Sequence, residues 1–181
     1  MLVLTIQRRD IVGKILNGTY HVNLWQSPYV YQSVRFTEGY NKILNELERK
    51  TKTSLIDGES CYWGWVKNPY IDFFNYNKDE YVALFVDIPK SEMVFSDYDK
   101  YTDYVLENSN ETDFIVESIT DGVPADCVQC SFLSLDPSNI KLTVPLSMLN
   151  KGCKSVSDMY HAASCRYIWF YLNKLNQVAI S

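Results

Sequence analysis

The sequence contains no run of about 18 consecutive apolar residues, the length that a helix needs to cross a membrane, so we expect no membrane span. Only a few apolar residues precede Arg8 and Arg9, whereas a secretory signal has a basic end followed by a longer apolar core. We therefore expect a cytoplasmic protein. Its five cysteines are then expected to be reduced thiols.

The signatures of common enzyme classes are missing as well. The sequence has no GxSxG, HExxH, Walker or GxGxxG motif, and its two histidines are His21 and His161. Basic residues form only small clusters, and the net charge is −5. Phosphate binding normally needs an overall positive field, so direct binding to nucleic acid is not expected.

What the sequence does contain is enough apolar surface for one core. Its 181 residues, 46% of them hydrophobic, suit a single globular domain over residues 1–181. Tyrosine is frequent, at 14 residues against 8 Phe and 4 Trp. Tyrosine packs at the rim of a core, and it is also favoured at binding surfaces.

The apolar pattern predicts strands and helices in alternation. Both registers of residues 81–88 are apolar, which predicts a strand covered on both faces. Helical spacing from Phe36 to Leu47 predicts an amphipathic helix, and residues 155–175 predict a long helix that packs across the sheet or lies in a dimer interface. Further strands are expected at residues 2–6, 61–66, 93–95, 114–119, 126–135 and 140–144, with the last two paired as a hairpin.

These elements predict a fold of the α+β class. We expect a single domain with a mixed, mostly antiparallel sheet, packed with an N-terminal amphipathic helix and a long C-terminal helix. Within the aromatic strand, Gly64 stands between Trp63 and Trp65. A glycine there would allow another backbone or a ligand to approach closely.

Charge is distributed unevenly along the chain. Residues 72–126 hold 14 Asp and Glu against 3 Lys, a net charge of −11, whereas the segments on either side are each +3. Such asymmetry indicates either a charged partner or the solvated side of an ordinary fold. Ser96-Asp97 offers an N-cap for a helix in this acidic segment, on which Asp99, Asp103 and Glu107 follow at i,i+4 steps.

Like charges at that spacing cost a helix a few tenths of a kcal/mol per pair, so a function could favour keeping them. One such function is mimicry of nucleic-acid phosphates toward a basic partner. The alternative is a solvated helix start whose acids favour the helix dipole. The residues expected to bind the partner are Asp97, Tyr98, Asp99, Tyr101, Asp103 and Glu107.

Four residues have the side-chain types of a zinc site. Cys127 and Cys130 form a CxxC sequence, and His161 and Cys165 stand one turn apart on the last predicted helix. Residues three apart on a strand point to opposite faces, which argues against one shared metal. We therefore expect buried thiols, a surface histidine and no metal.

Several short motifs follow one another in an order that resembles a known family. They are Thr5-Ile-Gln7, Leu16-Asn-Gly18, Phe36/Tyr40/Ile43/Leu47, Trp63-Gly-Trp65, Ile88-Pro89 through Ser96-Asp97-Tyr98, Tyr104-Val-Leu106 and Val128-Gln129. Together they resemble a family of uncharacterised bacterial and phage proteins, known only as a domain of unknown function. The resemblance covers about residues 1–144 and implies a microbial or phage origin, without an activity.

A looser resemblance is to ADP-ribosyltransferase folds, which open with a strand carrying a polar residue that contacts NAD. The resemblance assigns this role to Gln7, places Gln129 at the position of the catalytic acid and leaves Tyr62 or Trp63 to stack on nicotinamide. Glutamine cannot act as a carboxylate base, so the resemblance implies NAD binding more than transfer.

The leading functional hypothesis is a non-enzymatic binding protein of phage or mobile-element origin without a cofactor. It would dock an acidic, tyrosine-bearing surface on a basic partner, such as a nuclease of bacterial immunity, in the manner of an anti-CRISPR inhibitor. The alternative is an NAD-binding, ADP-ribosyltransferase-like protein.

Overall fold

The computed structural model describes residues 1–26, 33–56, 58–66, 76–117, 119, 128–150, 152–153 and 155–178, with side chains given up to residue 170. The helices are α1 (Arg9–Leu16), α2 (Val34–Thr51), α3 (Tyr98–Val105) and α4 (Val156–Val178). The strands are β1 (Leu2–Arg8), β2 (Tyr62–Trp65), β3 (Tyr81–Asp87), β4 (Met93–Asp97), β5 (Ile115–Val116), β6 (Val128–Phe132) and β7 (Ile140–Pro145).

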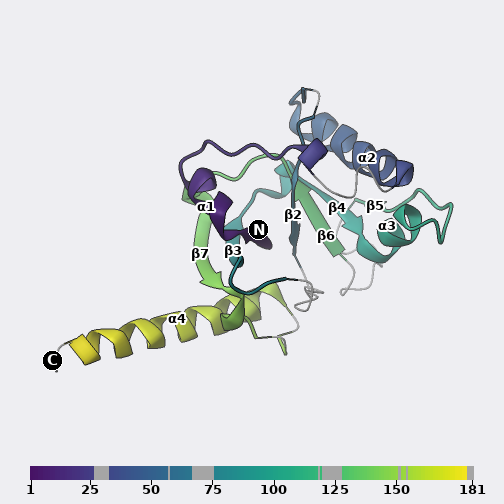
Figure 1. The fold of residues 1–181 in the computed structure, drawn as a ribbon. Coiled ribbons are helices and arrows are strands. Elements are labelled where there is room, and N and C mark those ends of the chain that lie inside the picture. Colours follow the sequence, from purple (N-terminus) through teal and green to yellow (C-terminus); the bar gives the residue numbers. More distant parts are fainter. Residues whose placement is uncertain are drawn as a thin grey trace.

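The strands form one sheet in the order β5-β4-β6-β2-β1-β3-β7. All pairings between described strands are antiparallel. This confirms the predicted α+β fold, including the amphipathic helix α2 and the long C-terminal helix α4 (Figure 1). Strand β3 is buried on both faces and pairs with β1 and β7, as its continuous apolar run predicted.

The predicted hairpin between residues 126–135 and 140–144 is wrong. Strand β6 pairs with β2 and β4, whereas β7 pairs with β3 on the other side of the sheet. Between them Asp136 accepts a hydrogen bond from the Ser138 backbone N–H at 2.8 Å and starts the 3-10 turn Pro137–Asn139. This turn redirects the chain instead of folding it back on β6. Residues 126 and 127 lie outside the described part of the chain.

Each face of the sheet has its own cover. On one face, α1 packs Val12 and Ile15 against alternate residues of β1, β3, β4 and β6. On the other face, α2 and α3 cover the end of the sheet near β4, and α4 covers the end near β7. The alternation of Val3 and Leu4 between these two faces follows from the two-residue period of a strand.

The described helices include none that is both long enough and apolar enough to span a membrane, α4 included.

Candidate functional site

Helix α3, which carries the predicted acidic surface, has well-formed ends. Asp97 is its N-cap and accepts a hydrogen bond from the Lys100 backbone N–H at 3.1 Å. The helix ends at Leu106, and Glu107 adopts a left-handed conformation with φ of 64°. The Glu107 N–H bonds the Tyr104 carbonyl and the Asn108 N–H bonds the Asp103 carbonyl, which is the hydrogen-bond pattern of a Schellman motif.

The acidic residues of this segment divide into buried and exposed ones. Asp99, Asp103 and Glu107 are exposed, whereas the capping residue Asp97 is only 7% exposed. Asp99 and Asp103 lie one helical turn apart, about 6 Å along the axis. The expectation that Glu107 continues the same helix is wrong, because the chain has left the helix at Leu106. Glu107 instead leads the loop that follows.

The tyrosines of α3 serve packing more than the surface. Tyr101 is 7% exposed and contacts the rings of Trp63 and Phe114, and burial raises its pKa. Tyr98 is half-buried and meets Trp65 edge-on at 5.2 Å. Asp97 and Tyr101, both predicted to bind a partner, therefore lie in the core.

One tyrosine that the sequence reasoning missed lies at the surface between α2 and α3. The Tyr104 hydroxyl donates to Glu38 at 2.9 Å, and the Arg35 guanidinium lies 5.6 Å from the centre of its ring. Burial and the Glu38 carboxylate raise the pKa of Tyr104. The two helices approach this closely because Gly39 has no Cβ, which would lie 3.1 Å from the Tyr101 ring. The i,i+3 spacing from Tyr101 is a signal that could have marked Tyr104.

Three basic residues next to this surface hold the loop after α3. Arg35 donates to the Ser109 carbonyl and the Asn110 side chain, both at 2.8 Å. Lys42 donates to the Thr112 carbonyl, and Lys100 forms an ion pair with Glu111 at 2.8 Å. The hydrogen bond and charge of Glu111 raise the pKa of Lys100.

These cations leave part of the negative charge uncompensated. Of the three basic side chains, only Lys100 pairs with a carboxylate in the described chain, and that carboxylate is Glu111. Asp103 and Glu107 form no ion pair with any described residue. Residues 97–113 hold six acidic residues and one lysine. The result is a negative surface on an ordered helix and a loop held by hydrogen bonds.

The four residues considered for NAD do not converge. Gln129 of β6 pairs with Trp65 of β2, and Trp65 pairs in turn with Leu4 of β1, so these three side chains lie on the same face of the sheet. Gln7 lies three residues from Leu4, so it points to the opposite face of the sheet from Gln129. Its amide donates to the Thr5 hydroxyl at 2.8 Å.

The two aromatic candidates on β2 also point apart. Tyr62 is buried in the core under α1, where it stacks on Phe132 with ring centres 5.5 Å apart. Trp63 faces α2 and donates from its indole N–H to the Tyr40 hydroxyl at 2.6 Å. Each ring therefore has a packing role in this structure.

The cysteines considered for zinc are separated in the same way. Cys130 is buried on the face under α1, whereas His161 and Cys165 are exposed on α4 on the other side of the sheet. Cys127 lies outside the described residues. No group of three His, Cys, Asp or Glu side chains in the described part of the chain is arranged to hold a metal ion. Burial raises the pKa of the Cys130 thiol, as it raises that of Cys61 to about 12.

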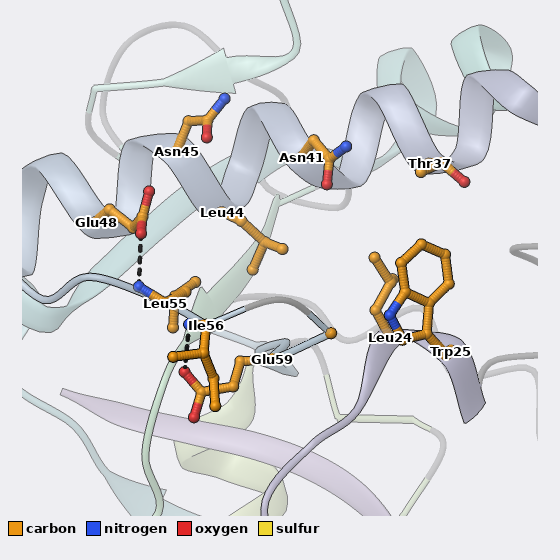
Figure 2. A pocket seen from close by; sticks show the side chains of 11 residues that line it. Leu24, Trp25, Thr37, Asn41, Leu44, Asn45, Glu48, Leu55, Ile56 and Glu59 are labelled. Carbon is orange, nitrogen blue, oxygen red and sulfur yellow. Dashed lines mark hydrogen bonds between the residues drawn. The ribbon is translucent and has the colours of Figure 1, made fainter.

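A cleft of about 300 Å³ lies between α2 and the segments at residues 24–25, 55–56 and 58–59 (Figure 2). Its two carboxylates bond to the backbone: Glu48 accepts from the Leu55 N–H at 2.6 Å, and Glu59 accepts from the Ile56 N–H at 2.9 Å. Trp25 lies against Gly58 at one end. Both acids therefore hold the backbone of residues 55 and 56, and Asn41 and Asn45 of α2 also line the cleft.

Comparison with protein families, curated proteins and solved structures finds no match to this chain, so neither resemblance drawn from the sequence gains support from known proteins.

Proposed function

We propose that this protein is a non-enzymatic binding protein that docks the surface of α3 and its following loop on a basic partner. The observation that carries the proposal is the pair Asp103 and Glu107, which are exposed and lack ion pairs among the described residues. Together with Asp99 they present carboxylates from a capped helix and a loop tied to α2. Ordered charge loses less entropy on binding than charge on a mobile segment.

The partner best suited to this surface is a protein groove built to bind phosphates. Carboxylates one helical turn apart are negatively charged, as the phosphates that such a groove binds are. A nuclease of bacterial immunity has this kind of groove, and blocking it would make the protein an anti-CRISPR-like inhibitor. The NAD-binding alternative is favoured by no specific observation, since Gln7 and Gln129 lie on opposite faces of the sheet.

The test is a charge reversal at three exposed positions, Asp99→Lys, Asp103→Lys and Glu107→Lys. The matched control reverses Asp79, Glu80 and Glu92, which are also exposed, lie outside α3 and change the net charge equally. Binding to purified RNA-guided nucleases is measured by calorimetry over a range of salt concentrations. We expect the α3 variant to lose about tenfold or more in affinity and most of the salt dependence, and the control to lose little.

Two outcomes would count against the proposal. Unchanged affinity and salt dependence in the α3 variant would refute it. An equal loss in both variants would assign binding to the overall charge and not to α3. Circular dichroism of each variant shows that a lost interaction is not a lost fold.

A further inference from the structure

A second cleft, of about 400 Å³, lies on the α1 side of the sheet. Its walls come from the end of α1 and the chain that follows, from β2 and the residues before it, and from residues 133–137 after β6. Tyr20 and Tyr62 line it, with their ring centres 6.3 Å apart. It is here called the tyrosine cleft. Leu55 and Glu59 line both this cleft and the smaller one in Figure 2.

Much of the wall of the tyrosine cleft is apolar. Ile15 of α1, Val22 and Leu135 line it, and they pack in the same core cluster as Tyr62. A cleft of this size with apolar walls and a few polar groups is the usual form of a site for a small organic molecule. A ligand that fills the tyrosine cleft therefore needs an apolar part.

The acidic and basic residues of the tyrosine cleft favour a cation. Glu59 and Asp136 line it, and its described lining residues include no Lys or Arg. Hydrogen bonds from Ser138 hold the pKa of Asp136 below its usual value, so this carboxylate is ionised at neutral pH. Glu59 accepts from the Ile56 N–H through Oε2, and its Oε1 accepts no hydrogen bond from the described chain. His21, which is exposed, is the one described lining residue that can gain a positive charge.

The end of α1 adds to this negative potential. Ile15 and Gly18 both line the cleft, and the Gly18 N–H bonds the Ile15 carbonyl at 2.9 Å where the helix stops. Gly18 has a φ of 65°, the left-handed conformation that ends many helices. The C-terminal end of a helix carries a partial negative charge and attracts cations. The helix end and the two carboxylates therefore favour the same sign of charge in a ligand.

The two tyrosines suit a cation as well. Tyr62 is only 4% exposed, and the one hydrogen bond of its hydroxyl in the described chain runs to the Tyr20 carbonyl at 3.5 Å. This is longer than the roughly 2.5–3.0 Å of an ordinary O–H···O bond, so the phenol oxygen has room for a better partner. An ammonium can donate to that oxygen, and the face of a tyrosine ring attracts a cation.

We infer that the tyrosine cleft binds a small organic amine, a molecule with a protonated nitrogen on an apolar chain or ring. The carboxylates of Glu59 and Asp136 attract the ammonium, and the apolar part packs against Ile15 and Leu135. The ring of Tyr20 adds a cation–π contact. No residue of α3 lines the cleft in the described chain, so the inference does not depend on the proposed function.

The first experiment compares three ligands of similar shape and different charge on the full chain. Phenethylamine is a cation, phenethyl alcohol is neutral and phenylacetate is an anion. We expect nuclear magnetic resonance titration to give phenethylamine about tenfold higher affinity than phenethyl alcohol, and to show no binding of phenylacetate. Amide signals of residues 20–22, 59–62 and 133–136 should move.

The second experiment removes the charge of the cleft and keeps its hydrogen bonds. Glu59→Gln/Asp136→Asn retains both oxygen acceptors for the backbone and should lower the affinity for phenethylamine about tenfold, with that for phenethyl alcohol unchanged. The matched control Asp79→Asn/Glu92→Gln alters exposed residues outside the cleft, changes the net charge equally and should bind as the wild type does.

Three outcomes would overturn the inference. The first is equal affinity of the wild type for phenethylamine and phenethyl alcohol, a comparison that needs no variant to fold. The second is an equal loss in both double variants, which would assign the attraction to the overall charge. The third is tighter binding of N-acetyl-lysine methylamide than of phenethylamine, which would assign the cleft to a lysine of a protein partner. We expect weaker binding of this probe, because its two amide groups would meet apolar walls.

Discussion

Gly64 is the residue on which the centre of the sheet depends most directly. A Cβ at this position would overlap the Val3 side chain and lie 3.1 Å from the Leu4 carbonyl oxygen. Val3 and Leu4 are fully buried, so neither has room to move away. The sequence predicted a close approach here from the glycine between two tryptophans, and the approaching group is the neighbouring strand β1.

We therefore expect Gly64→Ala to destabilise the fold by about 1–3 kcal/mol, the usual cost of an overpacked core. Gly13→Ala is the matched control. Gly13 lies in α1 with nothing within 4 Å of the position of a Cβ, so alanine should stabilise that helix by up to about 1 kcal/mol. Urea unfolding of both variants measures the difference. Equal stability of Gly64→Ala and wild type would show that β1 and β2 can separate without cost.

The sequence predicted which residues lie on α3 and on the strands better than it predicted which of their side chains are exposed. Exposure of Asp99 and Asp103 follows from helix phase, whereas burial of Tyr101 depends on α2 lying across α3 at Gly39. No local pattern specifies that crossing. The same holds for the NAD candidates, because the face on which Gln7 or Gln129 lies depends on strand register.

At the scale of elements, α3 is fixed by its two ends. Its start was predictable, because Asp97 is a favoured N-cap residue. Its end was not, because Glu107 takes the left-handed conformation that a glycine usually marks.

Strand pairing was predictable only in part. The apolar runs show that β6 and β7 are strands, whereas the turn at Asp136 decides that they do not pair with each other.

Loss of the cap should weaken α3 more than loss of an exposed acid. We expect Asp97→Ala to cost about 1 kcal/mol, since the Lys100 N–H loses its acceptor, and Asp97→Asn to cost much less. Asp103→Ala, which removes an exposed carboxylate from the same helix, should change stability by less than about 0.5 kcal/mol. Chemical denaturation of the three variants gives the comparison. A cost for Asp97→Ala no larger than that for Asp103→Ala would contradict the capping role.

At the scale of the whole molecule, both sheet faces bury ionisable groups in their neutral form. Burial raises the pKa of Tyr62, on the α1 face, and of Cys61, on the α2 face, each to about 12. Tyr40 and Tyr101 beside Cys61 are also raised, first of all by burial. A phenol or thiol that loses its proton in the core destabilises the fold, so high pH should weaken the packing on both faces of the sheet.

Because the folded pKa values exceed the unfolded ones, the unfolded chain releases these protons first as pH rises. The free energy of unfolding should keep its full value below about pH 9. Above that it should fall by about 1.4 kcal/mol per pH unit for each such group, up to about pH 12. Tyrosinate absorbance and near-ultraviolet circular dichroism should therefore change together. Tyr62→Phe, which loses only a 3.5 Å hydrogen bond, should shift this transition to higher pH, whereas Tyr167→Phe at an exposed position of α4 should not. Ionisation of all tyrosines near pH 10 with an unchanged circular dichroism spectrum would contradict this prediction, because it would show that the phenols of Tyr62, Tyr40 and Tyr101 are open to solvent.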